Sequence, residues 1–136
     1  SVIRFLPNVL SADECQYFRT FKQHVPWTDP IINNLCYDIS EIAAINTADP
    51  AYARIETRKE GHPWHTDKGT KGHMQWCTFA ASILLSHPDE FAGGRYQTRS
   101  KFAPIEQGMM VLTSSDVEHK VHKHSGDRTV LLMFFT

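Results

Sequence analysis

The 136-residue sequence has little of several features that would assign it to a specialised class of protein. Its three cysteines are odd in number and widely separated, so they indicate neither a disulfide framework nor a CxxC zinc site, and we expect reduced thiols packed as small hydrophobic side chains. No apolar run approaches the length of a membrane span, and residues 1–5 lack the apolar core of a signal peptide. We therefore expect a cytoplasmic protein that does not cross a membrane.

An excess of charge of either sign is also missing. The 14 Lys and Arg residues nearly balance the 15 Asp and Glu residues, so there is no general attraction to nucleic acid or to an anionic membrane, and neither is an expected partner. Hydrophobic residues at 41% and charged residues at 21% are ordinary values for a globular protein. The length suits a single domain over residues 1–136, which we divide into a helical N-terminal segment at about 1–50 and a β-rich core at about 51–136.

The N-terminal segment predicts one or two helices. Ser11 is followed three residues later by Glu14, the pattern of a capping box, which predicts a helix over residues 11–24. A second helix is predicted over residues 40–46 from its apolar spacing. The proline- and asparagine-rich stretch 25–34 between them predicts a loop.

From residue 51 the hydrophobic pattern changes to a period of two, which predicts strands. Alternation over residues 51–58 gives a strand with one strongly charged face, formed by Arg54, Glu56 and Arg58. Residues 74–86 are apolar on both faces, as expected of a central strand. About eight strands without an internal repeat fit a mainly β fold, a double-stranded β-helix or jelly roll of two facing sheets with an open mouth.

The candidate functional residues centre on His65-Thr66-Asp67. In an extended strand, residues two apart point to the same side, so His65 and Asp67 would face the same way. Completed by His119 from a later strand, they would form a 2-His-1-carboxylate facial triad, which holds Fe(II) on one face and leaves three coordination positions open. His62 is spaced across a proline and is expected beside this site or on the surface.

Four features follow one another along the chain: the HxD motif at 65–67, Gly93-Gly94, His119, and Gly126-Asp127-Arg128 before a final apolar strand. This order resembles that of the Fe(II)- and 2-oxoglutarate-dependent dioxygenases, and within them the prolyl-4-hydroxylase-like branch. The resemblance covers roughly residues 51–136 well. It implies oxidative decarboxylation of 2-oxoglutarate by O2 to succinate and CO2, coupled to hydroxylation of a peptidyl (prolyl-like) or small-molecule substrate. Ascorbate is a candidate reductant.

The same resemblance implies roles for individual residues. His65, Asp67 and His119 would be the metal ligands and catalytic centre. Arg128 would pair with the far carboxylate of 2-oxoglutarate, because a buried charge is costly unless paired and a guanidinium can donate two parallel hydrogen bonds to it. Thr78 and Trp76, from the predicted long strand, would contact the cosubstrate.

One departure and two alternatives stay open. Relatives often carry a tyrosine where this chain has Arg58, three residues before Gly61, which leaves open how the near end of 2-oxoglutarate is held. A non-catalytic cupin-like metal- or ligand-binding module is the main alternative, although a cupin usually shows His-x-His. A zinc hydrolase with the same ligands is less favoured, because no residue stands out as its general base. Substrate specificity would lie in loops, at 25–50, 68–72 and 87–92.

Overall fold

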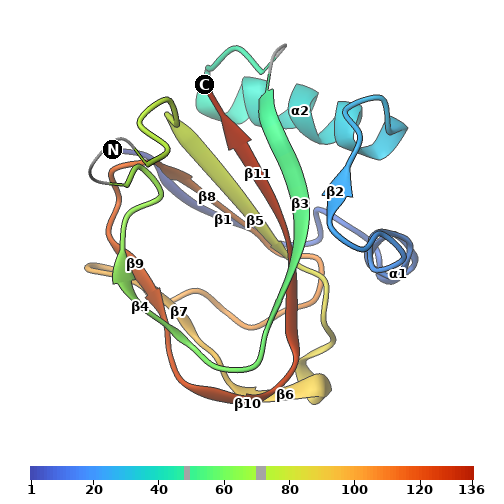
Figure 1. The fold of residues 1–136 in the computed structure, drawn as a ribbon, viewed down its shortest axis with the longest axis vertical. Coiled ribbons are helices and arrows are strands. Elements are labelled where there is room, and N and C mark those ends of the chain that lie inside the picture. The colour runs from blue at the N-terminus through green and yellow to red at the C-terminus, as the bar shows by residue number, and fades with distance from the viewer. Residues whose placement is uncertain (48–49, 70–72) are drawn as a thin grey trace.

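The computed structural model describes residues 1–47, 50–69 and 73–136. Eleven β-strands dominate this part of the chain, and the two α-helices both precede β3 (Figure 1). This arrangement confirms the predicted mainly β fold with N-terminal helices. The strands are β1 (Ile3–Leu6), β2 (His24–Val25), β3 (Pro50–Arg58), β4 (His62–His65), β5 (Phe79–Leu84), β6 (Phe91–Gly93), β7 (Tyr96–Thr98), β8 (Met110–Ser114), β9 (His119–Val121), β10 (His124–Gly126) and β11 (Arg128–Phe135).

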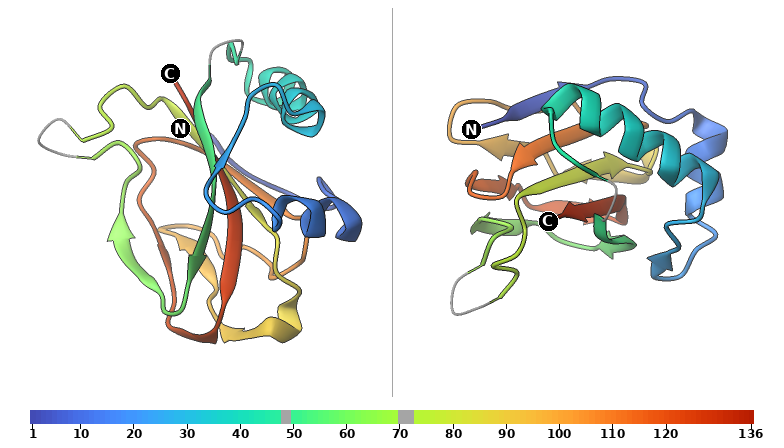
Figure 2. Two further views of the ribbon diagram at one scale, coloured as in Figure 1. Left: turned by 45° about the vertical axis from the view of Figure 1, so that its right-hand side comes forward. Right: turned by 90° about the horizontal axis from the view of Figure 1, so that it is seen from above.

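The strands form two facing sheets, with a short additional pair. The large sheet has the order β1-β8-β5-β11-β3-β2, the small sheet has the order β4-β9-β7, and β10 pairs with β6. From β3 onward the chain passes back and forth between the two sheets, since β3, β5, β8 and β11 belong to the large one and β4, β7 and β9 to the small one. Every pairing is antiparallel. This alternation is the winding of a double-stranded β-helix, as predicted (Figures 1 and 2).

Both helices begin at side-chain caps. Helix α1 (Ala12–Phe18) has the predicted capping box between Ser11 and Glu14, but it ends well before residue 24. Helix α2 (Pro30–Ala43) begins where a loop was predicted. Its N-cap is Asp29, whose carboxylate accepts hydrogen bonds from two backbone N–H groups, and proline suits the next position because its missing N–H would be unpaired there anyway. Of the predicted helix at 40–46, only residues 40–43 are helical, as the last turn of α2, and the helix ends at Ala43.

The main hydrophobic core lies between these helices and the outer face of the large sheet (Figure 2). It joins buried aromatic and aliphatic side chains, and three of them, Phe18 of α1, Ile39 of α2 and Leu112 of β8, are 0% exposed. Strand β3 contributes Ala53 to this face. Because side chains alternate along a strand, the neighbouring charged residues of β3 must then face the small sheet.

The predicted long strand at 74–86 is shorter in the structure. Met74 has a positive φ of 50°, and the Cys77 N–H bonds to the Met74 carbonyl, so residues 73–76 form a turn and β5 begins only at Phe79. Trp76 therefore precedes the strand. All three cysteines are free and buried, as expected. Of the predicted loop at 68–72, residues 70–72 lie outside the described part of the chain. Within the described ranges, no helix is long and apolar enough to span a membrane.

Candidate metal centre

Strand pairing brings the two predicted histidine ligands together. Strand β4 ends at His65 and β9 begins at His119, and these two residues are direct partners in the antiparallel ladder. Residues opposite each other in such a ladder have neighbouring side chains on one face. The two imidazole rings accordingly lie with their centroids 4.2 Å apart.

Asp67 completes the cluster from just beyond the end of β4. The Lys68 N–H bonds to the Ser115 carbonyl, which holds this part of the chain against the turn before β9. The Asp67 Oδ1 atom lies 3.6 Å from His119 Nε2. Ligand atoms of His65, Asp67 and His119 all lie within 4.8 Å of one another, and no other group of three metal-ligating side chains in the described residues comes as close. One divalent ion could touch all three.

The two imidazoles are oriented for metal binding. His65 Nδ1 lies 2.8 Å from the Pro63 carbonyl oxygen, and His119 Nδ1 lies 2.9 Å from that of Val117. Because a carbonyl oxygen only accepts hydrogen bonds, Nδ1 must carry the proton in each ring, which leaves the Nε2 lone pair free for a metal. Burial also lowers the pKa of His65, which favours the neutral form that ligates.

Asp67 lies in a desolvated position. Burial raises the pKa of its carboxyl group, and the neighbouring His119 and His65 offset this only in part. A carboxylate held away from water without a full positive partner is costly. A divalent cation between Asp67 and the two histidines would supply that partner, so the residues present fit a metal ion.

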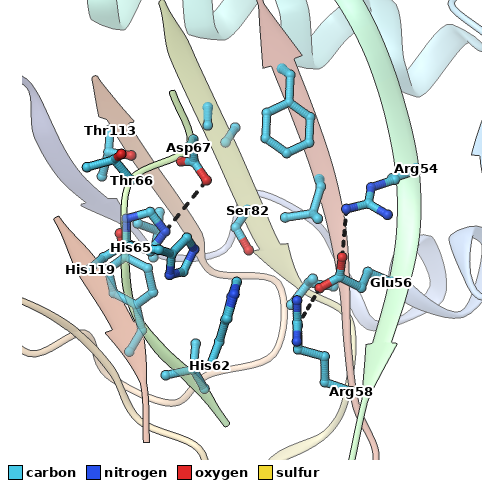
Figure 3. A pocket seen from close by; sticks show the side chains of 18 of the residues that line it. Arg54, Glu56, Arg58, His62, His65, Thr66, Asp67, Ser82, Thr113 and His119 are labelled. Atoms are coloured by element: carbon cyan, nitrogen blue, oxygen red, sulfur yellow. Dashed lines mark hydrogen bonds and ion pairs between the residues drawn. The ribbon is translucent and has the colours of Figure 1, made fainter. Parts of the chain in front are cut away.

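The metal-ligating cluster opens into a cavity of about 390 Å³ between the two sheets (Figure 3). The small sheet contributes His62, His65 and His119 to its lining, and the large sheet contributes the charged face of β3 together with Arg128 of β11 and Ser82 of β5. The charged face predicted for residues 51–58 thus points into the protein. Glu56 forms an ion pair with Arg54, whose Nη2 lies 2.8 Å away, and accepts a hydrogen bond from Arg58 Nε at 2.7 Å.

Arg128 stands at the start of β11, opposite Arg58 in the ladder. Burial lowers the pKa of its guanidinium to about 10, although Glu56 acts in the opposite direction. Its Nε atom is buried and has no hydrogen-bond partner among the described residues. Nearly all buried donors in proteins are paired, so a guanidinium that lines a cavity with its buried Nε unpaired indicates a site for an anion.

Two aromatic rings lie beside the ligands: Tyr96, which the sequence did not single out as a site residue, and His62, which was expected beside the site or on the surface. Tyr96 of β7 is buried and stacks on His119, with ring centroids 5.3 Å apart. The His62 ring packs at a tilt against that of His65, with centroids 3.7 Å apart, and lines the cavity, and burial there lowers its pKa to about 4. Tyr96 and Thr98 are two apart on β7 and are both buried on one face of the strand. That alternation was the sequence signal that could have indicated an inward-facing Tyr96.

The other predicted cosubstrate contacts do not line this cavity. Trp76 is 39% exposed and packs edge-on against Tyr52. The Thr78 hydroxyl donates to the Phe135 carbonyl. The structure therefore brings together His65, Asp67, His119 and Arg128 around one cavity and leaves Thr78 and Trp76 outside it.

Fold and site together define a double-stranded β-helix protein in which a His-Asp-His cluster and a partly buried arginine line one cavity. No protein-family model and no curated protein matches the sequence. Solved structures do match. An oxidoreductase of the 2OG-Fe(II) oxygenase family from Burkholderia pseudomallei superimposes with a TM-score of 0.72 at 16% identity, over 98% of this chain and 84% of that one.

Two prolyl hydroxylases are similar to the same degree. The collagen prolyl hydroxylase of Paramecium bursaria Chlorella virus-1, solved as a complex with 2OG, gives a TM-score of 0.73 at 10% identity over 98% of this chain and 94% of that one. A prolyl-4-hydroxylase from Pseudomonas putida gives a TM-score of 0.66 at 16% identity, over 98% of this chain and 84% of that one. At these identities the likeness establishes a shared fold, that of the 2OG-Fe(II) oxygenases.

Proposed function

We propose that this protein is an Fe(II)- and 2-oxoglutarate-dependent oxygenase that hydroxylates a peptidyl or small-molecule substrate. The observation that carries the proposal is the presence, in one cavity, of a cluster suited to a divalent metal and of a guanidinium whose buried Nε has no hydrogen-bond partner among the described residues. A metal cluster by itself would suit a hydrolase or a binding module equally well, and a buried arginine by itself would suit many anion sites. Both together are what a metal and an anionic cosubstrate require.

In this proposal, His65 and His119 bind Fe(II) through Nε2 and Asp67 binds it through its carboxylate. When bound, Fe(II) supplies O2 activation coupled to conversion of 2-oxoglutarate to succinate and CO2. The rings of Tyr96 and His62, which pack against His119 and His65, hold the two imidazoles in place, as neighbouring groups around metal ligands commonly do.

Arg128 would bind the far carboxylate of 2-oxoglutarate and so orient the cosubstrate toward the metal ligands. The apolar wall formed by Val130 and Leu132 of β11 limits water in the cavity, which strengthens the charge-assisted hydrogen bonds of the guanidinium. Glu56 does not take the place of the 2-oxoglutarate carboxylate on Arg128, because Glu56 is already paired with Arg54 and Arg58. The same pairing removes the one cavity glutamate that a zinc hydrolase could use as a general base.

The test is an anaerobic titration of Fe(II)-loaded protein with 2-oxoglutarate, in which bidentate binding gives a weak visible charge-transfer band. We expect the band with the unaltered protein. Asp67→Ala and His119→Ala should lose both iron and band, and Arg128→Ala should keep iron and lose the band. His87→Ala, at an exposed position remote from the cluster, is the matched control and should behave like the unaltered protein.

The outcomes separate the alternatives. Iron binding that survives Asp67→Ala would contradict the ligand assignment. A band without succinate formation under O2, with ascorbate present, would favour the non-catalytic binding module. Absence of the band in the unaltered protein would remove 2-oxoglutarate from the proposal.

A further inference from the structure

The cavity has a second arginine position beyond that of Arg128. Arg58 lies opposite Arg128 in the ladder between β3 and β11, whereas Arg54 lies opposite Leu132. Four residues of extended strand separate Arg54 from Arg58, which corresponds to roughly 13 Å between their backbones. Figure 3 shows the two arginines on either side of Glu56, with the metal-ligating side chains on the facing wall.

Arg54 has hydrogen-bonding capacity to spare. One of its terminal nitrogens forms an ion pair with Glu56 at 2.8 Å, while its Nε is buried and finds no partner among the described residues. The side chain is 34% exposed, so its outer edge is open to a ligand. Of the two arginine Nε atoms left unpaired in this cavity, one belongs to Arg128 and the other to Arg54.

The charges of the cavity also leave room for a second anion. Three arginines and one glutamate give the large-sheet wall a surplus of two positive charges. A divalent metal bound to Asp67 adds one more, and dianionic 2-oxoglutarate removes two, so one positive charge remains. A partly desolvated charge without a counterion is costly, and a monoanionic ligand would neutralise it.

The surroundings of Arg54 suit a carbon skeleton. Met74 and Phe134 line the cavity on this side. Tyr52 packs against Phe134 with ring centroids 5.0 Å apart and against partly exposed Trp76 at 6.0 Å. An apolar and aromatic wall beside one guanidinium is the combination that binds a small molecule with one carboxylate.

We propose that the substrate of this oxygenase is a small organic acid whose carboxylate pairs with Arg54 while its carbon skeleton packs against Met74 and Phe134. This inference rests on the proposed function, because it assigns 2-oxoglutarate to Arg128. The cavity, at about 390 Å³, is near the lower end of the usual range for ligand pockets, roughly 300–1,000 Å³, and so fits a small molecule beside the cosubstrate.

The experiment uses protein saturated with Mn(II) and 2-oxoglutarate, and observes the proton NMR signals of matched acid and amide probes. The pairs are N-acetyl-L-proline with N-acetyl-L-prolinamide and phenylacetate with phenylacetamide, so that each acid is a monoanion and each amide is neutral. Paramagnetic Mn(II) broadens signals only of molecules held close to it, so broadening reports binding in this cavity. We expect at least one acid to bind about tenfold or more tightly than its amide, since only the acid makes a charge-assisted pair with Arg54.

Variants then identify the arginine. In Arg54→Gln the affinities for an acid and for its amide should differ by no more than about twofold. Affinity for 2-oxoglutarate should be unchanged, which also shows that the cavity is folded. Arg54→Lys should retain a preference for acids. Arg4→Gln, an exposed position on β1, is the matched control and should change nothing.

Several results would overturn the inference. These are equal binding of acids and amides, binding of a neutral end-blocked prolyl peptide as tight as that of any acid, or no broadening of any probe while 2-oxoglutarate binds. Loss of 2-oxoglutarate affinity in Arg54→Gln would also overturn it, because Arg54 would then belong to the cosubstrate site. If Mn(II) and 2-oxoglutarate themselves fail to bind, the proposed function fails first and this inference with it.

Discussion

Replacing Arg128 by glutamine is expected to stabilise the ligand-free protein and, at the same time, to weaken binding of 2-oxoglutarate. The pKa of this guanidinium is lowered by burial to about 10, against an ordinary arginine value of roughly 12.5 or more. A tenfold change in a protonation equilibrium corresponds to about 1.4 kcal/mol, so holding the charged group in this position costs on the order of 3 kcal/mol.

Glutamine removes that cost but also some packing of the arginine side chain, so we expect a net gain of about 1–2 kcal/mol in the free energy of unfolding. In a chain of this length the midpoint of thermal unfolding should rise by roughly 3–8 °C. The measurement is thermal unfolding followed by circular dichroism, without metal or ligand.

The effect on the cosubstrate has the opposite sign. A hydrogen bond to a charged group contributes about 1.5–3 kcal/mol, and the variant also leaves the ligand carboxylate unpaired inside the cavity. The dissociation constant of 2-oxoglutarate should rise by about 100-fold in calorimetric titrations of Mn(II)-loaded protein. Arg99→Gln is the matched control, because Arg99 lies over the Trp64 ring and pairs with Glu118 on the surface.

Two results would refute this reasoning. Unchanged affinity for 2-oxoglutarate in Arg128→Gln would show that the arginine does not bind the cosubstrate. If ligand-free Arg128→Gln is less stable than the unaltered protein, contacts within the fold must compensate the charge of the guanidinium. The unpaired Nε of Arg128 would then not indicate a ligand site.

Three further predictions concern the centre and its support. Burial raises the pKa of Asp67, so the free energy of unfolding of the metal-free protein should fall as the pH rises above the ordinary aspartate range, where this carboxyl must ionise. Asp67→Asn should remove that fall, and bound Mn(II) should reverse it. The measurement is denaturant unfolding at several pH values. Leu112→Ala, at a fully buried core position, should cost about 3 kcal/mol in urea unfolding, and a loss below about 1 kcal/mol would contradict the assigned core. Gly108→Ala should destabilise by about 2 kcal/mol or more, because Gly108 has a φ of +82° and a Cβ there would lie 2.0 Å from the Leu10 carbonyl oxygen; native-like stability would contradict this close approach.

Much of the fold was predictable because its signals are local. The capping box at Ser11 starts α1, and the final strand runs over 128–135 as its apolar pattern indicates. The start of α2 was missed even though Asp29-Pro30 is itself a local helix-start signal, because the prolines and asparagines around it also favour a loop. Strand 74–86 was predicted too long, since a hydrophobic pattern does not reveal that Met74 adopts a left-handed backbone conformation.

The sequence by itself determined which residue types were available: an HxD motif, a later histidine, an arginine at the head of the last strand, and a strand with a charged face. Only the tertiary structure decided that His65 lies opposite His119, that Tyr96 stacks on this pair, and that the charged face of β3 lines the cavity. The physical reason is that strand alternation specifies two faces but not their surroundings. Which face meets helices and which meets the other sheet depends on pairings between segments far apart in the chain.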